Sequence, residues 1–568
     1  MKLFSVRITV SAVLLFLSSP SVLYATYTST ISGSTATMTG DAASDTLIIG
    51  QTAGLYSHNR FAAGDPGFNS QFDFNSAVPG DQTLSTSDTI TVNSGDGNDS
   101  VVVGDAVNLG GTVDGGPGTD TLDYSMYTSG VRANLGLGTT GLTANLTADQ
   151  QNPPTTHAGT GTASITNYNI VTRTFDITVN VSGLLPADVA GFHIHQSPVG
   201  VDGPVIVDFT GVAPLVPSGN GFTFTATGLS MPALSEAAFL GGGTYVNIHT
   251  AAFPVGAIRG QLFSSGNVNL ATGAATGTSG LSNFENLTGG SSIDSLVGNF
   301  SANTVNGGPG ADWIVGGPGA DTLNGDAGAD VLVWSGGDGS DTIEGGTDSD
   351  SVQVNGGSAD EDFMVSANGA RLAFARTTPG PFSLDVGTVE TLIVNGVGGS
   401  DGFFVNNLTG VAALSTVDFN GFEGDDFFAY APTSSGAFVF NARGGPGSDA
   451  LQGPNSASTW NVTAPDQGNI AGLVTFRFVE IFVGGTGSDT FNVKAFASGT
   501  PEFILGGTTG PNTLNYDAEL RTVSGDTTPP DGFILSPGVQ DVSFLQIQIV
   551  NILNQSTLQR RRGQITAQ

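Results

Sequence analysis

The sequence predicts an all-β protein with two kinds of β-structure, an array of short repeated strands and a separate antiparallel β-sandwich. Nine-residue segments rich in glycine and aspartate recur along the chain, each ending near an apolar residue at a fixed phase. Between residues 142 and 263 these segments stop, and longer stretches alternate apolar and polar residues as half-buried strands do. Helical periodicity is weak throughout the 568 residues.

The composition indicates a folded protein that needs cations. Acidic residues outnumber basic ones 49 to 15, giving a net charge of −34, and there are 84 glycines. So acidic a chain is a poor partner for nucleic acid. A hydrophobic content of 39% with 35 phenylalanines argues against disorder. Dense carboxylates in a folded protein need counter-charge, and divalent cations are the obvious supply.

The N-terminus predicts export. Lys2 and Arg7 are followed by a short apolar stretch at residues 10–17 and a small-residue cleavage site after Ala25. Residues 1–25 therefore read as a secretory signal peptide, and no later segment is long enough for a transmembrane helix. The chain has no cysteine, so an exported protein here does without disulfides. We expect a secreted, extracellular or cell-surface protein in which bound metal is a natural cross-link.

The clearest repeats occupy residues 281–356 and step by nine from Gly289. The best copies read GGPGADWIV, GGPGADTLN and GGDGSDTIE. Six residues make a turn in which glycine allows positive φ, and the turn offers carbonyl and carboxylate oxygens, the hard ligands that Ca²⁺ prefers. The last three residues form a short strand. Its apolar residues are predicted to point inward: Trp313, Ile314, Leu323, Leu332 and Ile343.

This GGxGxDxUx pattern, with U apolar, resembles the calcium-binding nonapeptide of RTX (hemolysin-type) proteins. The resemblance implies a parallel β-roll in which two nonapeptides make one coil, so that like turns stack at every second nonapeptide. Asp294, Asp312 and Asp330 should then line one edge, and Asp321 the other. The predicted calcium ligands are Asp294, Gly307, Gly308, Gly310, Asp312, Gly316, Gly317, Gly319, Asp321, Gly328, Asp330, Gly336, Gly337, Gly339, Asp341 and Asp350, with Gly115, Gly116, Gly118 and Asp120 in a separate copy.

Isolated copies start at Gly115, Gly444 and Gly484. They lie in an N-terminal β region, residues 26–138, and a C-terminal all-β region, residues 357–568. Residues from about 380 to 500 are expected to form less regular all-β structure and not one continuous nonapeptide run. A lone turn supplies only part of the six to eight oxygens of a calcium site. Loss of Asp449, in the second copy, is therefore expected to change calcium affinity little. A phosphate-binding loop is disfavoured because GK[ST] is absent and the carboxylates repel anions.

Residues 142–263 resemble a chordin-type (CHRD) domain. The resemblance is carried by QNPPTTHAGTGTASI, VSGLLPADVAGFHIHQ and GGGTYVNIHTAAFPVGAIRGQLF. Membership implies an antiparallel β-sandwich of a kind found in many exported bacterial proteins. Similar flanks on both sides, around Asn134 and Asn269, indicate that this domain is inserted within the repeat array.

Three histidines of this segment are candidate metal ligands. His193 and His195 alternate with core residues and share one outward strand face, and His249 lies on another strand. Together they could bind copper or zinc. GFHIHQ also resembles the copper-site strand of copper–zinc superoxide dismutase, with Arg259 placed like that family's active-site arginine. No histidine lies between His195 and His249, so three ligands are the most available. The alternative is that these residues hydrogen-bond and order loops.

Two functions are therefore expected. The first is a non-enzymatic, calcium-stabilised extracellular or cell-surface protein whose CHRD-like domain is a binding or structural module with an unnamed ligand. The alternative is a copper-dependent, dismutase-like oxidoreductase sited at the histidines. The sequence shows no Ser-His-Asp order, paired-carboxylate motif or HExxH that would indicate a hydrolase.

Overall fold

The computed structural model describes residues 27–560 apart from short gaps. The predicted signal peptide lies outside the described residues. No helix in the described part of the chain is long and apolar enough to cross a membrane. The gaps are residues 61–66, 136–141, 149, 153–154, 170–171, 198–201, 233–234, 236–238, 240–242, 265–273, 431–437, 465, 495–501, 508–510, 518–521, 527–530, 536–541, 548 and 554–556.

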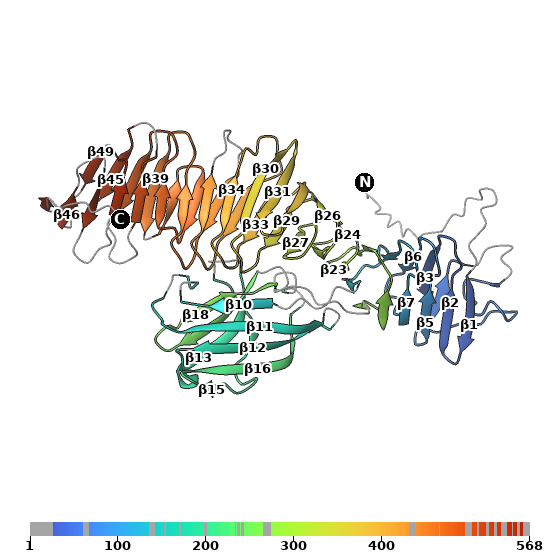
Figure 1. The fold of residues 1–568 in the computed structure, drawn as a ribbon. Helices are drawn as coiled ribbons and strands as arrows, with labels where there is room; N and C mark the ends of the chain where they lie inside the picture. Colours follow the sequence, from blue (N-terminus) through green and yellow to red (C-terminus); the bar gives the residue numbers. More distant parts are fainter. Residues whose placement is uncertain are drawn as a thin grey trace, which may run out of the picture.

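Most of the chain forms a long parallel β-solenoid, drawn from blue to red in Figure 1. Its coils place strands alternately in two sheets. One sheet contains β9 (Arg132–Asn134), β23 (Ser295–Val297), β25 (Trp313–Val315), β27 (Val331–Ser335), β29 (Ser351–Asn355), β33 (Thr391–Asn395), β35 (Thr416–Asn420), β37 (Val439–Arg443), β41 (Val474–Arg477), β40 (Gln467–Ile470), β39 (Thr459–Ala464), β43 (Thr490–Lys494), β45 (Thr513–Asp517) and β49 (Ile549–Leu553).

The second sheet faces the first, and the apolar core lies between them. It contains β3 (Thr46–Thr52), β6 (Ser100–Val103), β8 (Thr121–Asp123), β22 (Asn286–Thr288), β24 (Thr304–Pro309), β26 (Thr322–Ala327), β28 (Thr342–Thr347), β32 (Phe382–Gly387), β31 (Arg371–Thr378), β30 (Asp362–Asn368), β34 (Gly402–Val405), β36 (Phe427–Tyr430), β38 (Ala450–Gln452), β42 (Ile481–Val483) and β44 (Glu502–Leu505). Ile314, Leu323, Leu332 and Ile343 are buried between the two sheets, as their phase predicts.

The repeat run has the register that its period requires. Thr304 pairs with Thr322, and Trp313 with Val331, in each case two nonapeptides further along the chain. Trp334 and Ser335 lengthen β27 by two residues, and the next coil absorbs them, so that Thr322 pairs with Thr342. The inserted indole is buried and stacks on Phe382 at 3.6 Å. The insertion therefore changes the spacing of the coils in sequence while the strands stay stacked.

The solenoid continues on both sides of the repeat run, and its C-terminal coils are less regular in length than the nonapeptide coils, as expected. On the N-terminal side β8 pairs in parallel with β22, and β9 with β23. On the C-terminal side β33, β35 and β37 continue the parallel pairing. Hairpins and longer turns take up extra residues between strands, as in β30–β31–β32 and β39–β40–β41. Coil length thus varies although the strand stack does not.

A third small sheet covers the N-terminal coils. It contains β1 (Thr28–Ser32), β2 (Thr35–Thr39), β5 (Thr89–Asn93), β7 (Gly110–Asp114) and β21 (Gly280–Ser282). β7 and β21 are parallel neighbours although residues 115–279 separate them. The chain therefore leaves the solenoid after β9 and returns to the adjacent position.

Residues 142–264 form an antiparallel sandwich of two sheets. The larger contains β10 (Leu142–Leu146), β11 (Thr160–Asn169), β12 (Thr174–Ser182), β15 (Val216–Ser218), β16 (Gly221–Ser230) and β19 (Phe263–Ser264). The smaller contains β13 (Val189–Gln196), β14 (Val205–Asp208), β17 (Thr244–Thr250) and β18 (Ile258–Gln261). The sandwich core includes clustered rings of Phe192, Phe209, Phe222 and Phe224.

The sandwich packs against the solenoid beside the repeat run (Figure 1). Val297, Trp313, Val315 and Val333 from the outer face of β23, β25 and β27 belong to the same apolar cluster as the sandwich core. The prediction that Trp313 points into the roll was wrong. Its neighbour Ile314 points inward, and because side chains alternate along a strand, Trp313 faces the sandwich.

Candidate functional site

Aspartates at the turns of the solenoid form ladders along its edges. The amide of Asp294 donates to Asp312 Oδ1 at 2.8 Å, and the amide of Asp312 donates to Asp330 Oδ1 at 2.7 Å. Asp330 donates in the same way to Asp350 at 2.9 Å. On the opposite edge, Asp321 donates to Asp341 Oδ1 at 2.9 Å. The structure thus has the two edges that the repeat spacing predicts.

Most of the stacked aspartates leave a buried carboxylate oxygen without a hydrogen-bond donor, whereas Asp294 Oδ2 accepts the amide of Gly290. Among the described residues, Oδ2 lacks a partner in Asp99, Asp120, Asp312, Asp321, Asp330, Asp350, Asp401, Asp426 and Asp449. In each case Oδ1 already accepts an amide from the neighbouring coil. An unpaired buried charge is strongly unfavourable unless a cation meets it. These oxygens therefore have the hardness, charge and burial that fit Ca²⁺.

Backbone oxygens converge on the same places. A side-chain Cβ on Gly307 would lie 2.6 Å from Asp312 Oδ2 and 2.7 Å from the carbonyl oxygen of Gly325 in the next coil. Only glycine leaves room for the two oxygens to approach. The carboxylate and the stacked carbonyl are thus brought together by the turn, which is the oxygen-rich donor set that calcium takes.

Burial makes the unneutralised ladders unfavourable. Desolvation, together with the smaller repulsion from the carboxylates of Asp294 and Asp330, raises the pKa of Asp312 to about 8. Desolvation also raises the pKa of Asp321 and of Asp330 to about 7. Without a cation these carboxyl groups favour the protonated form near neutral pH. A bound divalent ion would restore their charged form.

The C-terminal coils carry a ladder of the same kind, so Asp449 does not lie in the isolated turn that the sequence suggested. The amide of Asp401 donates to Asp426 Oδ1 at 2.8 Å, and that of Asp426 to Asp449 Oδ1 at 2.7 Å. Desolvation raises the pKa of Asp449 to about 9. Its stacking partners lie 23 and 31 residues away, so a search at the spacing of two nonapeptides misses them.

Glutamates end three ladder segments. Glu285 Oε2 accepts the amide of Asp120, Glu390 Oε2 that of Asp350, and Glu480 Oε2 that of Asp449. Each glutamate comes two residues after a non-glycine residue with positive φ: Asn283, Thr388 and Phe478. Sequence reasoning did not assign these glutamates to the ladders. The signal was the apolar residue directly before each glutamate.

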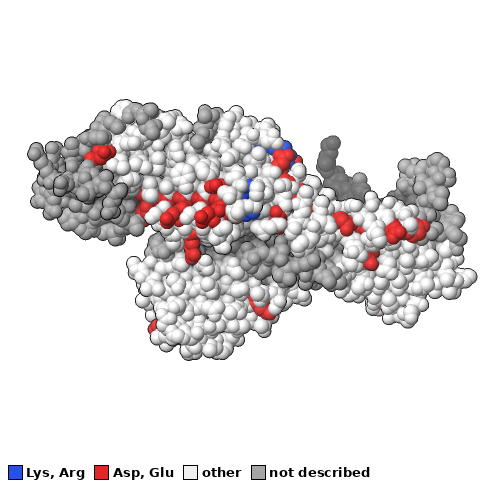
Figure 2. Space-filling model, viewed as in Figure 1, with Lys and Arg blue, Asp and Glu red and all other residues white. Residues whose placement is uncertain are grey.

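Further acids of the turns lie at the surface. Figure 2 shows acidic side chains in a row along the solenoid, whereas the surrounding surface carries few charges. Asp326, Asp348, Asp360 and Asp425 are exposed members of the turns. Arginines pair with buried acids at two ladder ends, Arg376 with Glu361 and Arg60 with Asp45. Most rungs have no such partner among the described residues and depend on another source of positive charge.

The comparisons with known families agree with both kinds of structure. Residues 142–262 match the CHRD domain, and residues 279–312, 297–332 and 335–358 match the RTX calcium-binding nonapeptide repeat. The chain carries a CHRD domain and RTX calcium-binding repeats. No curated protein matches the chain. The ladder of Asp401, Asp426 and Asp449 lies beyond the matched RTX residues, so its assignment rests on the geometry.

The predicted RTX glycines do not all belong to the stack. Gly308, Gly317 and Gly328 adopt positive φ in turns, and Gly116 does so in the N-terminal copy. Gly337 also has positive φ, but a Cβ on Gly336 or Gly337 would meet no atom within 4 Å, although Gly339 of the same turn lies against Gly319 of the neighbouring coil. Gly115, Gly118, Gly310, Gly316, Gly319 and Gly339 lie against oxygen atoms of their own or a neighbouring coil.

Asp338 is a residue of this region that sequence reasoning missed. Its carboxylate accepts the amide of Ser335 at 2.8 Å. Burial raises its pKa to about 7. It comes directly after Gly337, at a position that the consensus leaves unspecified, so the repeat pattern gives no signal for it.

The three predicted histidines of the CHRD domain do come together. His193 and His195 lie on β13, His249 lies on the adjacent β17, and one ring nitrogen from each lies within 4.8 Å of the other two. The sequence predicted an outward strand face for them, but the structure encloses them. His195 is 8% exposed, and the other two are partly buried. Desolvation lowers the pKa of His195 and of His249, which favours their neutral forms.

Arg259 does not join this cluster, contrary to the dismutase resemblance. Its guanidinium stacks on the Tyr245 ring at 3.4 Å, while His195 stacks on the same ring at 4.9 Å. β17, which carries Tyr245, lies between the strands of His195 and Arg259. The arginine is 1% exposed and pairs with Asp202 at 3.5 Å.

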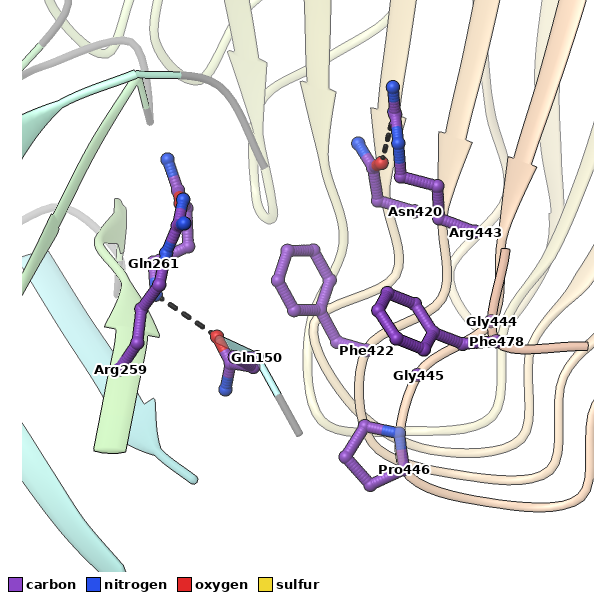
Figure 3. Close-up of a pocket in the computed structure, with 10 residues that line it drawn as sticks. All are labelled: Gln150, Arg259, Gln261, Asn420, Phe422, Arg443, Gly444, Gly445, Pro446 and Phe478. Atoms are coloured by element: carbon purple, nitrogen blue, oxygen red, sulfur yellow. Dashed lines mark hydrogen bonds between the residues drawn. The ribbon is translucent and has the colours of Figure 1, made fainter. Parts of the chain in front are cut away.

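Arg259 instead faces the seam between the CHRD domain and the solenoid, shown in Figure 3. The lining residues are Gln150, Arg259 and Gln261 from the CHRD domain and Asn420, Phe422, Arg443, Gly444, Gly445, Pro446 and Phe478 from the solenoid. The space for water-sized molecules is about 30 Å³. A volume of this order suits one or two waters and not an organic substrate. A second pocket at the same seam, lined by Asn152 and by solenoid residues that include Arg443 and Arg477, has about 310 Å³.

Proposed function

We propose that the protein is an exported extracellular or cell-surface protein whose solenoid folds on calcium and holds the CHRD domain as a binding or structural module. Calcium binding is the property that the RTX repeats bring. The observation that carries the structural role is the set of buried carboxylate oxygens left without donors in consecutive coils. Bound calcium would supply the positive charge that these turns lack.

The ladders would place calcium-dependent turns along most of the solenoid. The rungs of Asp401, Asp426 and Asp449 have the same amide-to-carboxylate bond and the same unpartnered oxygen as the RTX rungs. We therefore extend the calcium-binding role to these coils. Their lengths differ from the RTX period, but the local turn is equivalent.

The test is the fold of the full chain with and without calcium. Circular dichroism and thermal melting should show a large gain of β-structure between excess chelator and about 10 mM calcium, because extracellular calcium sites have Kd on the order of 10⁻⁴–10⁻³ M. Identical spectra in the two conditions would contradict the proposal. Export is tested separately, by cell fractionation of the full chain and of a variant without residues 1–25.

The proposal includes no catalytic role. Acidic residues in the turns are accounted for by calcium, and the pocket of Figure 3 holds no more than one or two waters. The CHRD domain would then act through its surface.

A copper-dependent, dismutase-like oxidoreductase is the second candidate, and the observation that favours it is the clustering of His193, His195 and His249. The position of Arg259 across β17 speaks against it. Superoxide dismutation by the copper-treated full chain, compared with His249→Ala, tests this candidate.

A further inference from the structure

We propose that His193, His195 and His249 form a binding site for one transition-metal ion, zinc or copper, that ties β13 to β17 in the CHRD domain. This site is separate from the calcium ladders and requires no redox reaction. It shares with the oxidoreductase candidate only the presence of a metal.

Each of the three rings has a buried nitrogen without a partner. These atoms are His193 Nδ1, His195 Nε2 and His249 Nε2, and none has a hydrogen bond within the described structure. A buried polar atom left unpaired is unfavourable by about 1–3 kcal/mol. Three such atoms in one cluster are accounted for by a single ligand that accepts three lone pairs, which is what a metal ion does.

The other nitrogen of each ring is held in place. His195 Nδ1 lies 2.9 Å from the carbonyl oxygen of Gly203, and His249 Nδ1 lies 3.0 Å from that of Pro254. A carbonyl accepts only, so both rings carry their proton on Nδ1 and leave Nε2 with a lone pair. His193 Nε2 lies 3.5 Å from Asp208 Oδ1. A carbonyl or carboxylate behind each imidazole is the usual support of a metal-binding histidine.

The local sequence makes room for the three rings. Gly191 pairs across the strands with His249. A Cβ on Gly191 would lie 2.9 Å from His193 Cε1 and 3.5 Å from His249 Cδ2, so a larger residue would crowd both rings. Tyr245 stacks in parallel on His195 and fixes the plane of that ring.

The donor set selects the class of metal. Three imidazole nitrogens suit zinc and copper, whereas calcium takes oxygen ligands. Zinc–nitrogen bonds of about 2.0–2.1 Å would bring the three nitrogens to roughly 3.3–3.6 Å from one another. The present separations reach 4.8 Å, so the rings would close by about an ångström on binding. The result is a metal bridge between two strands of a domain that has no cysteine.

The experiment uses the full chain, freed of transition metals and kept in about 10 mM calcium throughout, so that the solenoid carboxylates are saturated. Zinc is titrated against a chromophoric chelator, and copper binding is followed in parallel by electron paramagnetic resonance. We expect one equivalent of either metal per chain. Binding should weaken at least 100-fold in His195→Ala and in His249→Ala and remain unchanged in His157→Ala. His157 is the matched control because its ring packs on Phe253 outside the cluster.

Equal zinc and copper binding by the wild type and His249→Ala, or binding that calcium displaces, would overturn the proposal. If the histidine variants do not fold, cobalt absorption of the wild type decides instead. Intense visible bands of a low-coordinate nitrogen site support the proposal, and their absence rejects it. Failure of the calcium-folding proposal would appear as an unchanged dichroism spectrum on calcium removal, which this metal titration does not measure.

Discussion

The solenoid and the CHRD domain both do without disulfides, but they treat buried polar groups in opposite ways. In the solenoid each residue lies above its counterpart in the next coil, so a carboxylate needed in one turn lies above another carboxylate. In the antiparallel CHRD sandwich neighbouring strands present different residues, and the interior is filled by a cluster of phenylalanines. Repetition by translation therefore creates like-charge contacts that an antiparallel sandwich avoids.

An asparagine ladder in the same solenoid has side-chain donors as well as acceptors, whereas the aspartate ladders have side-chain acceptors only. Asn395 Nδ2 donates to Asn355 Oδ1 at 2.9 Å, and Asn420 Nδ2 donates to Asn395 Oδ1 at 2.8 Å. An amide is both donor and acceptor, so stacked amides satisfy one another. A carboxylate only accepts, so stacked carboxylates require an added cation. The calcium dependence that we propose would thus follow from the choice of Asp over Asn at stacked positions.

Calcium removal should have the largest effect, because it should unfold the solenoid but leave the CHRD domain folded. At 10 mM calcium and a Kd near 10⁻⁴ M, each site stabilises the fold by about 2.7 kcal/mol. Several sites together exceed the roughly 5–15 kcal/mol that keeps a protein folded. We expect chelator to unfold the solenoid and leave a smaller cooperative melt from the CHRD domain, measured by calorimetry of the full chain. A single transition that calcium does not move would remove the distinction between the regions.

Without calcium, low pH should partly stabilise the solenoid, because protons neutralise its buried carboxylates. The folded-state pKa is about 8 for Asp312 and about 9 for Asp449, above the value of about 3.9 for an unfolded chain. Between pH 4 and 9 the folded form therefore keeps protons that the unfolded form has released, and stability falls as pH rises. In chelator we expect the solenoid to be more stable to urea at pH 5 than at pH 8. Saturating calcium should remove that trend, and stability that rises with pH in chelator would contradict it.

Trp313→Ala should weaken the contact between the two regions. The indole is 3% exposed and lies in the shared apolar cluster, and truncation of a buried aromatic costs about 3–5 kcal/mol. We expect a lower melting temperature of the CHRD domain in calcium, with calcium affinity nearly unchanged. Val439→Ala is the control, because Val439 occupies the same position on β37 and is 51% exposed. Equal effects of the two substitutions would show that the CHRD domain does not depend on this contact.

Asp449→Asn should have a smaller effect, with opposite consequences for calcium affinity and for stability in chelator. The asparagine keeps an acceptor for the amide of Asp426 but removes a buried charge. We expect weaker calcium binding by about 1–2 kcal/mol and greater stability in chelator, because the loss of an unpaired buried charge is favourable. Asp312→Asn should behave alike, since both residues lie in ladders. Asp188→Asn, an exposed acid of the CHRD domain, is the control for charge alone. Calcium titration followed by dichroism distinguishes the three.

The sequence predicted the solenoid where its period was regular. Asp294, Asp312 and Asp330 could be assigned to one edge because each of these coils consists of two complete nonapeptides. Asp401, Asp426 and Asp449 could not be found this way, because hairpins and longer turns change the coil length while the strands remain stacked. Trp313 was assigned to the wrong side, since strand alternation alone does not reveal that another domain covers the outer face.

The histidine cluster was predictable in part for a similar reason. The spacing of His193 and His195 places both on one strand face. The pairing of β13 with β17, which adds His249, depends on long-range contacts that no local pattern encodes. The enclosure by the backbone at Gly203 and Pro254 comes from loops, and it turned an expected outward face into a half-buried one.

The insertion of the CHRD domain between adjacent coils has a consequence for the order of folding. The amide of Asp120 donates to Glu285, 165 residues later, so the N-terminal coils lack their stacking neighbour until the whole inserted domain has been synthesised. The domain can shorten that delay, because its first and last strands are neighbours: Leu142 pairs with Ser264. Once folded, it holds its two ends together and acts as a short loop, which lowers the entropic cost of joining the coils. A domain that folds early and without calcium would thus hold the two solenoid segments close together while the proposed calcium-dependent coils complete their stacking.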